Sequence, residues 1–293
     1  MNATLTDTPQ PASIPPAPPV PRSPSPTARP SGGRLRLLAG QTAAEVRQNV
    51  RAPEYVVGVV AVPVILYAMF GLSNIGDVMP GGTDVGQILI ASFAAYGVVS
   101  LAIFTFGVDV AAERRRGWLR RLRATPMPMW AYFVGKLAMA LVFTTAITAL
   151  LLATGRVGGV SMEATTMARL LGVLLLGTLA FAPLGFALAF LATPKAATAI
   201  GNLIFLPLSF CSGFFMPLRT LPEVLQTLAG YLPTYHFGHL VWAQVAPAQD
   251  VSALTGEADG SLAGHAAIVV ATAVLCAGLA AWGYVRDGRR ERI

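Results

Sequence analysis

The sequence predicts an all-α integral membrane protein with six transmembrane helices. The 293-residue chain is 54% hydrophobic and only 12% charged, which is far more apolar than a soluble domain. Its apolar residues gather in spans of about 20 residues, the length that a helix needs to cross a bilayer. The six spans are Tyr55–Leu72, Gln87–Val108, Trp130–Ala153, Leu170–Leu191, Ala196–Met216 and Ala266–Val285.

The basic residues lie mainly on one side of these spans. With six spans both termini share a side, and that side holds 18 of the 21 Lys and Arg residues, while each side holds seven acidic residues. Only Arg156, Arg169 and Arg219 lie on the other side. This is the positive-inside distribution, so we expect a multi-pass plasma membrane protein with both termini in the cytoplasm. Nucleic-acid binding is not expected, because no binding module accompanies the arginines.

The N-terminal segment is expected to stand apart from the membrane domain. Residues 1–33 hold ten prolines and no apolar run, which favours a disordered cytoplasmic tail over a signal peptide. The membrane domain is expected to cover residues 34–293. At its start, Leu35–Ala52 has apolar residues on one helical face and three arginines, and Pro53 ends the pattern. This pattern predicts an interfacial helix on the membrane surface, with a plain basic segment as the alternative.

Six arginines lie in the loop between the second and third spans, from Glu113 to Pro126. Apolar residues recur before and among them at helical spacing, which predicts a short amphipathic helix on the cytoplasmic face. These residues are Ala111, Ala112, Trp118, Leu119 and Leu122. A loop that only fixes the topology is the alternative, but it needs arginines and no apolar face.

This loop resembles the signature loop of ABC exporter permeases, and more narrowly that of the type-two group that exports drugs, lipids and polysaccharides. The residues that match are Glu113, Gly117, Leu119, Leu122, Thr125 and Pro126, whereas Arg115 and Pro128 depart from the pattern. The resemblance implies that the loop is a coupling helix that docks into an ATP-hydrolysing subunit. The residues expected to make this contact are Glu113, Arg114, Gly117, Trp118, Leu119 and Leu122.

Each of these residues has an expected role. Glu113 should pair with a basic group of the ATPase or cap the helix, and Gly117 should let the chain bend. Trp118, Leu119 and Leu122 should pack in a groove of that partner.

A second signature follows the fifth span. Leu221, Val224, Leu225 and Leu228 have helical spacing in a segment too short to cross the membrane. The surrounding sequence is similar to the late signature of the same family, which implies extracellular re-entrant helices between spans five and six that close the exit. The residues expected to form this gate are Gly213, Phe214, Phe215, Pro217, Pro222 and Pro233.

Four other features have simpler expected roles. Lys136, two turns into the third span, should extend to the cytoplasmic interface. His236 and His239 should belong to an outer aromatic belt, because too few further ligands lie nearby to hold a metal. Residues 250–261 should form a polar, flexible external loop. Cys211 and Cys276 should be buried as small apolar residues.

The sequence also lacks a phosphate-binding G-x-x-x-x-G-K-[ST] loop and any constellation of catalytic residues, so it predicts no enzyme activity. We expect no cofactor in this chain, with ATP and Mg²⁺ bound by a separate ATPase subunit. The expected function is export of an amphipathic drug, natural product or lipid by two copies of the permease, or by one copy and a homologue. The alternatives are a polysaccharide or glycolipid exporter of the same family, an ion-coupled carrier, which would need a carboxylate inside the membrane, and a membrane enzyme.

Overall fold

The computed structural model describes residues 32–125, 127–256 and 261–290. The predicted disordered tail therefore lies outside the described residues, apart from Gly32 and Gly33. Within the described ranges the regular elements are helices, and the one β-type contact is an isolated bridge between Val78 and Asp84. The all-α prediction is confirmed.

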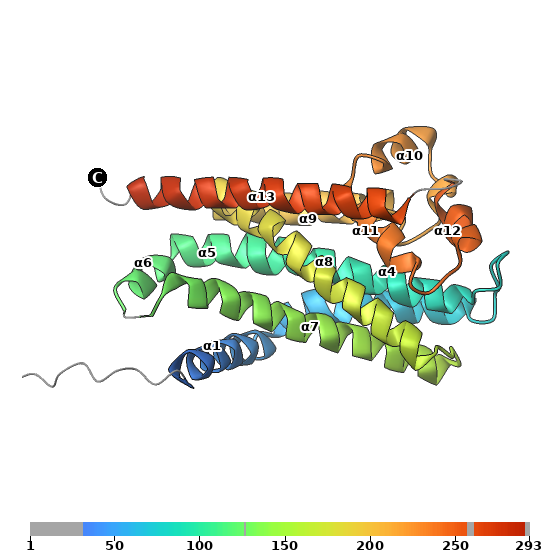
Figure 1. The fold of residues 1–293 in the computed structure, drawn as a ribbon, viewed down its shortest axis with the longest axis horizontal. Coiled ribbons are helices and arrows are strands. Elements are labelled where there is room, and N and C mark those ends of the chain that lie inside the picture. Colours follow the sequence, from blue (N-terminus) through green and yellow to red (C-terminus); the bar gives the residue numbers. More distant parts are fainter. Residues whose placement is uncertain (1–31, 126, 257–260, 291–293) are drawn as a thin grey trace, which may run out of the picture.

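The long helices lie side by side in an elongated bundle, and α8 crosses the others diagonally (Figure 1). In chain order the longer elements are α1 (Gly32–Val50), α4 (Val85–Ser100), α7 (Met129–Gly158), α8 (Ala164–Leu191), α9 (Pro194–Cys211) and α13 (Leu262–Arg290). The loop between the second and third spans forms α5 (Val110–Arg115) and α6 (Trp118–Arg123). Three short helices, α10 (Glu223–Ala229), α11 (Pro233–Trp242) and α12 (Ala248–Thr255), separate α9 from α13.

Five helical stretches are long and apolar enough to cross a membrane. They are Pro53–Asn74, Val85–Arg115, Met129–Gly158, Ala164–Leu191 and Leu262–Arg289. The predicted fifth span is not among them. Its helix, α9, ends at Cys211, five residues before the predicted end, and Lys195, Asn202 and Pro207 reduce its apolar character. The structure thus supports an integral membrane protein with five candidate spans.

The first two candidate spans contain wide helical turns. The first passes through α2 (Pro53–Tyr55), η1 (Val56–Ala61), α3 (Val62–Leu66), η2 (Tyr67–Gly71) and η3 (Leu72–Asn74), of which η1 and η2 are π-helical. Pro63 follows η1, and a wide turn there relieves the clash between the proline ring and the preceding carbonyl groups. In the second span, α4 continues into a nine-residue π-helical stretch, η4 (Leu101–Asp109).

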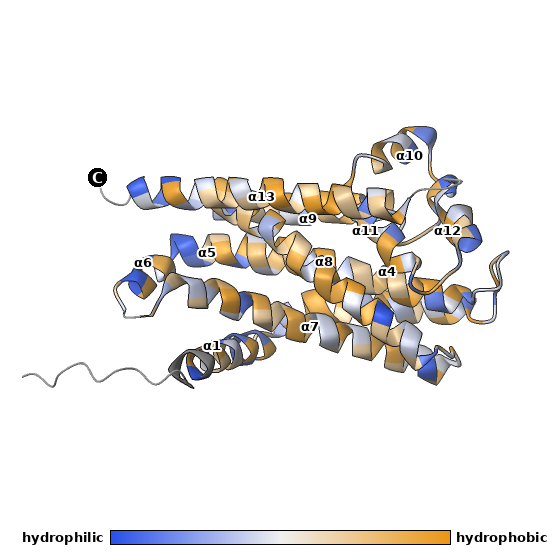
Figure 2. Ribbon diagram, in the orientation of Figure 1, coloured by the Kyte–Doolittle hydropathy of each residue, from blue (hydrophilic) through white to orange (hydrophobic). Residues whose placement is uncertain are grey.

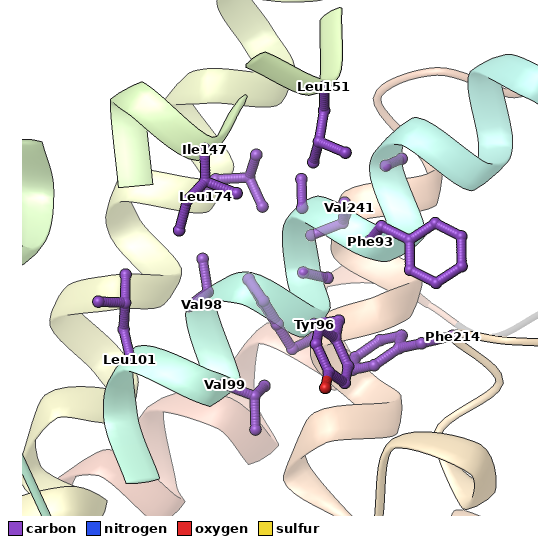
Figure 3. Close-up of a cluster of buried hydrophobic side chains, with 14 of the residues drawn as sticks. Phe93, Tyr96, Val98, Val99, Leu101, Ile147, Leu151, Leu174, Phe214 and Val241 are labelled. Atoms are coloured by element: carbon purple, nitrogen blue, oxygen red, sulfur yellow. The ribbon is translucent and has the colours of Figure 1, made fainter. Parts of the chain in front are cut away.

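The core of the bundle surrounds α4. Figure 3 shows Phe93, Tyr96 and Val98 of α4 among side chains from α7, α8 and α11. Further along the second span, Gly185 of α8 lies against the backbone of η4. A Cβ added to Gly185 would lie 2.0 Å from the carbonyl oxygen of Ala102. This close approach requires glycine and brings α8 directly onto the second span.

The two ends of the bundle differ in character (Figures 1 and 2). We call the end that carries α5, α6 and the C-terminal turns of α13 the basic end, because hydrophilic residues gather there. The opposite end, which we call the far end, carries α10, α11, α12 and the connection at residues 72–84. The middle of the bundle is predominantly apolar, as Figure 2 shows.

One connection at the far end is more ordered than the sequence indicates. The expected flexible loop at residues 250–261 is helical over its first part, because α12 runs to Thr255. Asp250 is fully buried there, and its carboxylate accepts hydrogen bonds from the backbone N–H groups of Gly81 and Thr83. The prediction of a flexible loop was therefore wrong for residues 250–255, because a distant turn supplies the N–H donors that allow this acid to be buried. Residues 257–260 lie outside the described residues.

Candidate coupling site at the basic end

The arginine-rich segment folds into two short helices joined at Gly117. We call residues 110–123 the basic turn; it comprises α5, Arg116, Gly117 and α6. Gly117 has φ +72°, a left-handed conformation that most side chains disfavour. The single amphipathic helix predicted from the sequence is thus broken in the middle, and the expected bend at Gly117 is confirmed. Pro126, which completes the matching motif, lies outside the described residues.

The apolar face of the basic turn points into its own chain. Leu119 and Leu122 are 3% and 8% exposed and pack with Val110, Tyr132 and Phe190. The expectation that both leucines pack in a groove of a partner is therefore wrong for this structure, because α7 and α8 already cover them. Trp118 is 44% exposed, and most of the arginines of the turn are exposed as well. The surface open to a partner is thus Trp118 with its flanking arginines.

A cluster of charged side chains lies directly behind this turn. We call Glu45, Glu113, Tyr132 and Lys136 the Lys136 cluster. The Nζ atom of Lys136 lies 2.8 Å from Oε1 of Glu113 and 3.1 Å from Oε2 of Glu45. The hydroxyl of Tyr132 donates to the second carboxylate oxygen of Glu113. The cluster therefore joins three elements: α1 through Glu45, α5 through Glu113, and α7 through Lys136.

Lys136 does not reach the interface as expected. Its side chain is 2% exposed, and both of its carboxylate partners lie within the protein. Removal of one partner from a buried ion pair leaves an uncompensated charge, which costs about 3–5 kcal/mol. The expectation for Glu113 was wrong in the same way, since Glu113 pairs with a lysine and a tyrosine of its own chain.

Arg114 also makes its contacts within the chain. Its guanidinium donates to the carbonyl oxygens of Phe190 and Ala192, at 2.8 Å each. It also lies 3.6 Å from the carboxylate of Asp287 near the end of α13. These carbonyl groups end α8, where a positive charge is favourable. Arg114 thus ties the basic turn to α8 and α13.

At the far end, the expected gate residues form the turn and the short helices that follow α9. Phe214 is buried and packs edge-on to Trp242, whereas Phe215 stacks on Phe210 and makes edge contacts with Phe93 and Tyr96. Gly213 lies in the turn after α9, Pro217 precedes η5 (Leu218–Thr220), Pro222 precedes α10, and Pro233 begins α11. The predicted short helix within 221–229 is confirmed as α10, and α11 is a second one. Their role as a gate stays a prediction.

Neutral hydrogen bonds hold this end together. The hydroxyl groups of Ser212 and Thr234 lie 2.6 Å apart, so the turn after α9 is joined to α11. The indole nitrogen of Trp242 donates to the hydroxyl of Ser92, which joins α11 to α4. The far end is therefore a packed layer over the end of the second span.

The histidines of the chain meet between α11 and α13. The Nδ1 atoms of His236 and His265 lie 2.7 Å apart, and His239 stacks on His265 with a centroid distance of 4.0 Å. All three are buried, so the expectation of an interfacial belt was wrong for His236 and His239. Burial lowers the pKa of His239 to about 3, with contributions from His265 and His236. No group of three His, Cys, Asp or Glu side chains with the arrangement of a metal site occurs among the described residues.

Comparison with known proteins identifies the family. The model of the family described as ABC-2 type transporter matches residues 40–243, which is more than half of the chain. The chain belongs to this family. The ABC-2 permease is the membrane subunit of an ABC transporter; ATP is hydrolysed in a separate subunit.

Two curated relatives support the assignment at low identity. The putative transport permease YvfS of Bacillus subtilis (strain 168) is 24% identical over 212 residues, which cover 72% of this chain and 86% of that protein. The probable multidrug ABC transporter permease YbhR of Escherichia coli (strain K12) is 27% identical over 184 residues. That match covers 58% of this ABC-2 permease and 49% of YbhR.

Sequence reasoning missed several residues of this site, although one signal was present. A lysine inside an apolar span needs a carboxylate partner, and Glu45, Glu54, Asp109 and Glu113 lie in the segments adjoining its end of the membrane. That requirement could have indicated Glu45 and Glu113. Ser92, Trp242 and His265 carry no comparable signal, because each is an isolated polar group in an apolar helix.

Proposed function

We propose that this ABC-2 permease is the membrane subunit of an exporter, in which the basic turn receives the motion of the ATPase. ATP binding would close the ATPase subunits and displace the turn, and the Lys136 cluster would pass this displacement to α1 and α7. The observation that carries the proposal is the Lys136 cluster itself, since one buried lysine holds the basic turn to two other helices. For this coupling the ATPase must bind one conformation of the permease better than the other, because a partner shifts an equilibrium between two conformations only in that case.

The topology fits this role if α9 is the fifth of six spans. Its 18 residues would extend about 27 Å at 1.5 Å per residue, close to the thickness of the hydrocarbon core. With six spans, both termini and the basic end would lie in the cytoplasm, and α10 and α11 would be extracellular re-entrant helices. Phe214 and Phe215 would then close the exit. The membrane would be the inner membrane of a bacterium.

The proposed cargo is an amphipathic drug, natural product or lipid. The printed name of YbhR describes that relative as a probable multidrug transporter permease. The predominantly apolar middle of the bundle supports the same class, because a highly charged cargo would find few partners there (Figure 2). Two copies of the chain, or one copy and a homologue, would enclose the path.

The test is co-purification of this chain with a co-expressed ABC ATPase subunit. Trp118→Ala removes the exposed indole of the basic turn, and we expect it to lower ATPase recovery by about ten-fold, as a loss of about 1.4 kcal/mol of binding would. Trp130→Ala is the matched control, because Trp130 is equally exposed at 45% but lies at the start of α7. Equal recovery with the two variants would contradict docking through the basic turn.

A further inference from the structure

A cavity at the basic end is lined in part by the carboxylates of Glu54, Asp109 and Glu113. Its volume is about 490 Å³, and it lies between α1, the first span, the end of the second span, α7 and α9. Cavities of roughly 300–1,000 Å³ hold drug-sized ligands. Two residues of the Lys136 cluster, Glu113 and Lys136, belong to its lining.

The lining of this cavity combines apolar and charged side chains. Tyr55, Val59, Phe104 and Val108 are its apolar and aromatic members. Glu54, Asp109 and Glu113 line it as well, together with the basic residues Arg116 and Lys136. Lys136 is already engaged by Glu45 and Glu113, and Arg116 is exposed. Because Lys136 and Glu113 compensate each other, Glu54 and Asp109 remain as acidic groups of the lining against one further basic group, Arg116.

Asp109 is the carboxylate without a direct partner. Among the described residues it makes no side-chain hydrogen bond or ion pair, although Lys136, Glu113, Arg116 and Glu45 act on it at longer range. It ends the π-helical stretch η4, and wide turns of this kind are frequent at functional sites. A partly buried carboxylate is stabilised by a cation that enters beside it.

We propose that this cavity binds an amphipathic cation, with Asp109 as the counter-ion of its ammonium or phosphonium group and with Tyr55 and Phe104 against its apolar body. The assignment rests on the proposed export function only in that the bound cation would be the cargo; binding itself requires no ATPase. A lipid amine offers the same chemistry as a free organic cation, and the test distinguishes the two.

The cavity also offers a steric test that changes no charge. A Cβ added at Gly58 would meet no atom within 4 Å, and Gly58 lines the cavity. Gly58→Phe therefore adds a ring to the lining of the cavity and should reduce the space open to the cation. Gly172 on α8 is equally open and lies away from the cavity, so Gly172→Phe is the matched control.

The experiment measures binding of radiolabelled tetraphenylphosphonium to the purified full-length chain in phosphatidylcholine nanodiscs, with empty nanodiscs subtracted. Triphenylphosphine oxide, a neutral competitor with three of the same rings, should compete at least about ten-fold more weakly than unlabelled cation. Asp109→Asn and Gly58→Phe should each weaken binding by about ten-fold or more. Asp77→Asn, at an exposed carboxylate of the far end, and Gly172→Phe should match the wild type.

The results separate the possible sources and failures. If added phosphatidylethanolamine displaces the label, the cavity accepts a lipid amine; if it does not, the cavity prefers a free organic cation. Binding that neither Asp109→Asn nor Gly58→Phe changes, or that the neutral competitor matches, overturns the proposal. Should Asp109→Asn fail to fold, Gly58→Phe alone decides. If the chain binds no cation but still co-purifies with the ATPase, only this site is refuted. If it binds the cation but does not co-purify with the ATPase, only the proposed exporter is refuted.

Discussion

The two ends of this permease are held together by different forces. At the basic end, charged groups join the elements: Lys136 holds α1 and α5, and Arg114 holds α8 and α13. At the far end, neutral hydrogen bonds and ring contacts join α9, α11 and α4 through Ser212, Thr234 and Trp242. Loss of one partner from a buried ion pair destabilises a protein more than loss of one neutral hydrogen bond does. This difference fits the roles proposed above, in which the basic end responds to the ATPase and the far end closes the exit.

The largest expected effect is on the basic end. Lys136→Met leaves the buried Glu45 and the partly buried Glu113 without a counter-charge and should destabilise the protein by about 3–5 kcal/mol. The measurement is thermal unfolding of the purified chain in detergent. The triple variant Lys136→Met, Glu45→Gln, Glu113→Gln removes all three charges and should recover most of the loss. A triple variant as unstable as the single one would show that the cluster does not act as an ionic unit.

A smaller effect is expected where a charge does occur at the far end. Asp250→Ala leaves the N–H groups of Gly81 and Thr83 unpaired and should cost about 2 kcal/mol. Asp250→Asn keeps an acceptor oxygen and should cost less. Limited proteolysis of the connection at residues 76–84 reads out the effect locally. Equal protection in the wild type and Asp250→Ala would contradict the assignment of Asp250 as the residue that holds this turn.

His239 should give the stability of the far end a modest pH dependence. The pKa of His239 is about 3 in the folded protein, whereas a free histidine titrates near 6.5. Between these values the unfolded chain binds more protons, so stability is fully present above about pH 6.5 and falls as the pH drops below it. The slope is at most about 1.4 kcal/mol per pH unit for this group.

The measurement is the melting temperature at pH 7.5 and pH 5.5. His239→Phe removes the titrating ring and should reduce the difference between the two temperatures. An unchanged difference would show that His239 does not contribute to the pH dependence.

The smallest expected effect concerns a neutral contact. Ser212→Ala removes one hydrogen bond to Thr234 and should cost about 1 kcal/mol in the same unfolding measurement. A loss as large as that of Lys136→Met would remove the distinction between the two ends.

The helices were predictable from the sequence, but their packing was not. Apolar runs locate every candidate span, because any helix that crosses a membrane must be apolar. They do not tell which face of a helix packs against other helices and which faces lipid, since lipid and the protein interior are both apolar. The most apolar 18-residue window of Val85–Arg115 is 89% buried, whereas that of Leu262–Arg289 is 11% buried. Both windows consist of the same kinds of residue.

The polar contacts were hidden for a related reason. Glu113 and Lys136 are 23 residues apart in the chain, and Glu45 is 91 residues from Lys136. Periodicity reports only local neighbours, so it assigned Leu119 and Leu122 correctly to one face of the basic turn but could not tell what covers that face. Asp250 was missed in the same way, because its partners at Gly81 and Thr83 come from the first connection at the far end.

The most direct test of the proposed coupling measures movement at the far end when the ATPase is trapped with ATP at the basic end. Spin labels at Val78 and Val224, both well exposed, report the distance between the first connection and α10 after Cys211 and Cys276 are replaced by Ser. We predict that ATP trapping changes this distance in the complex. The neutral triple variant of the Lys136 cluster should bind the ATPase but show no change, and a change of the same size in that variant would contradict coupling through the cluster.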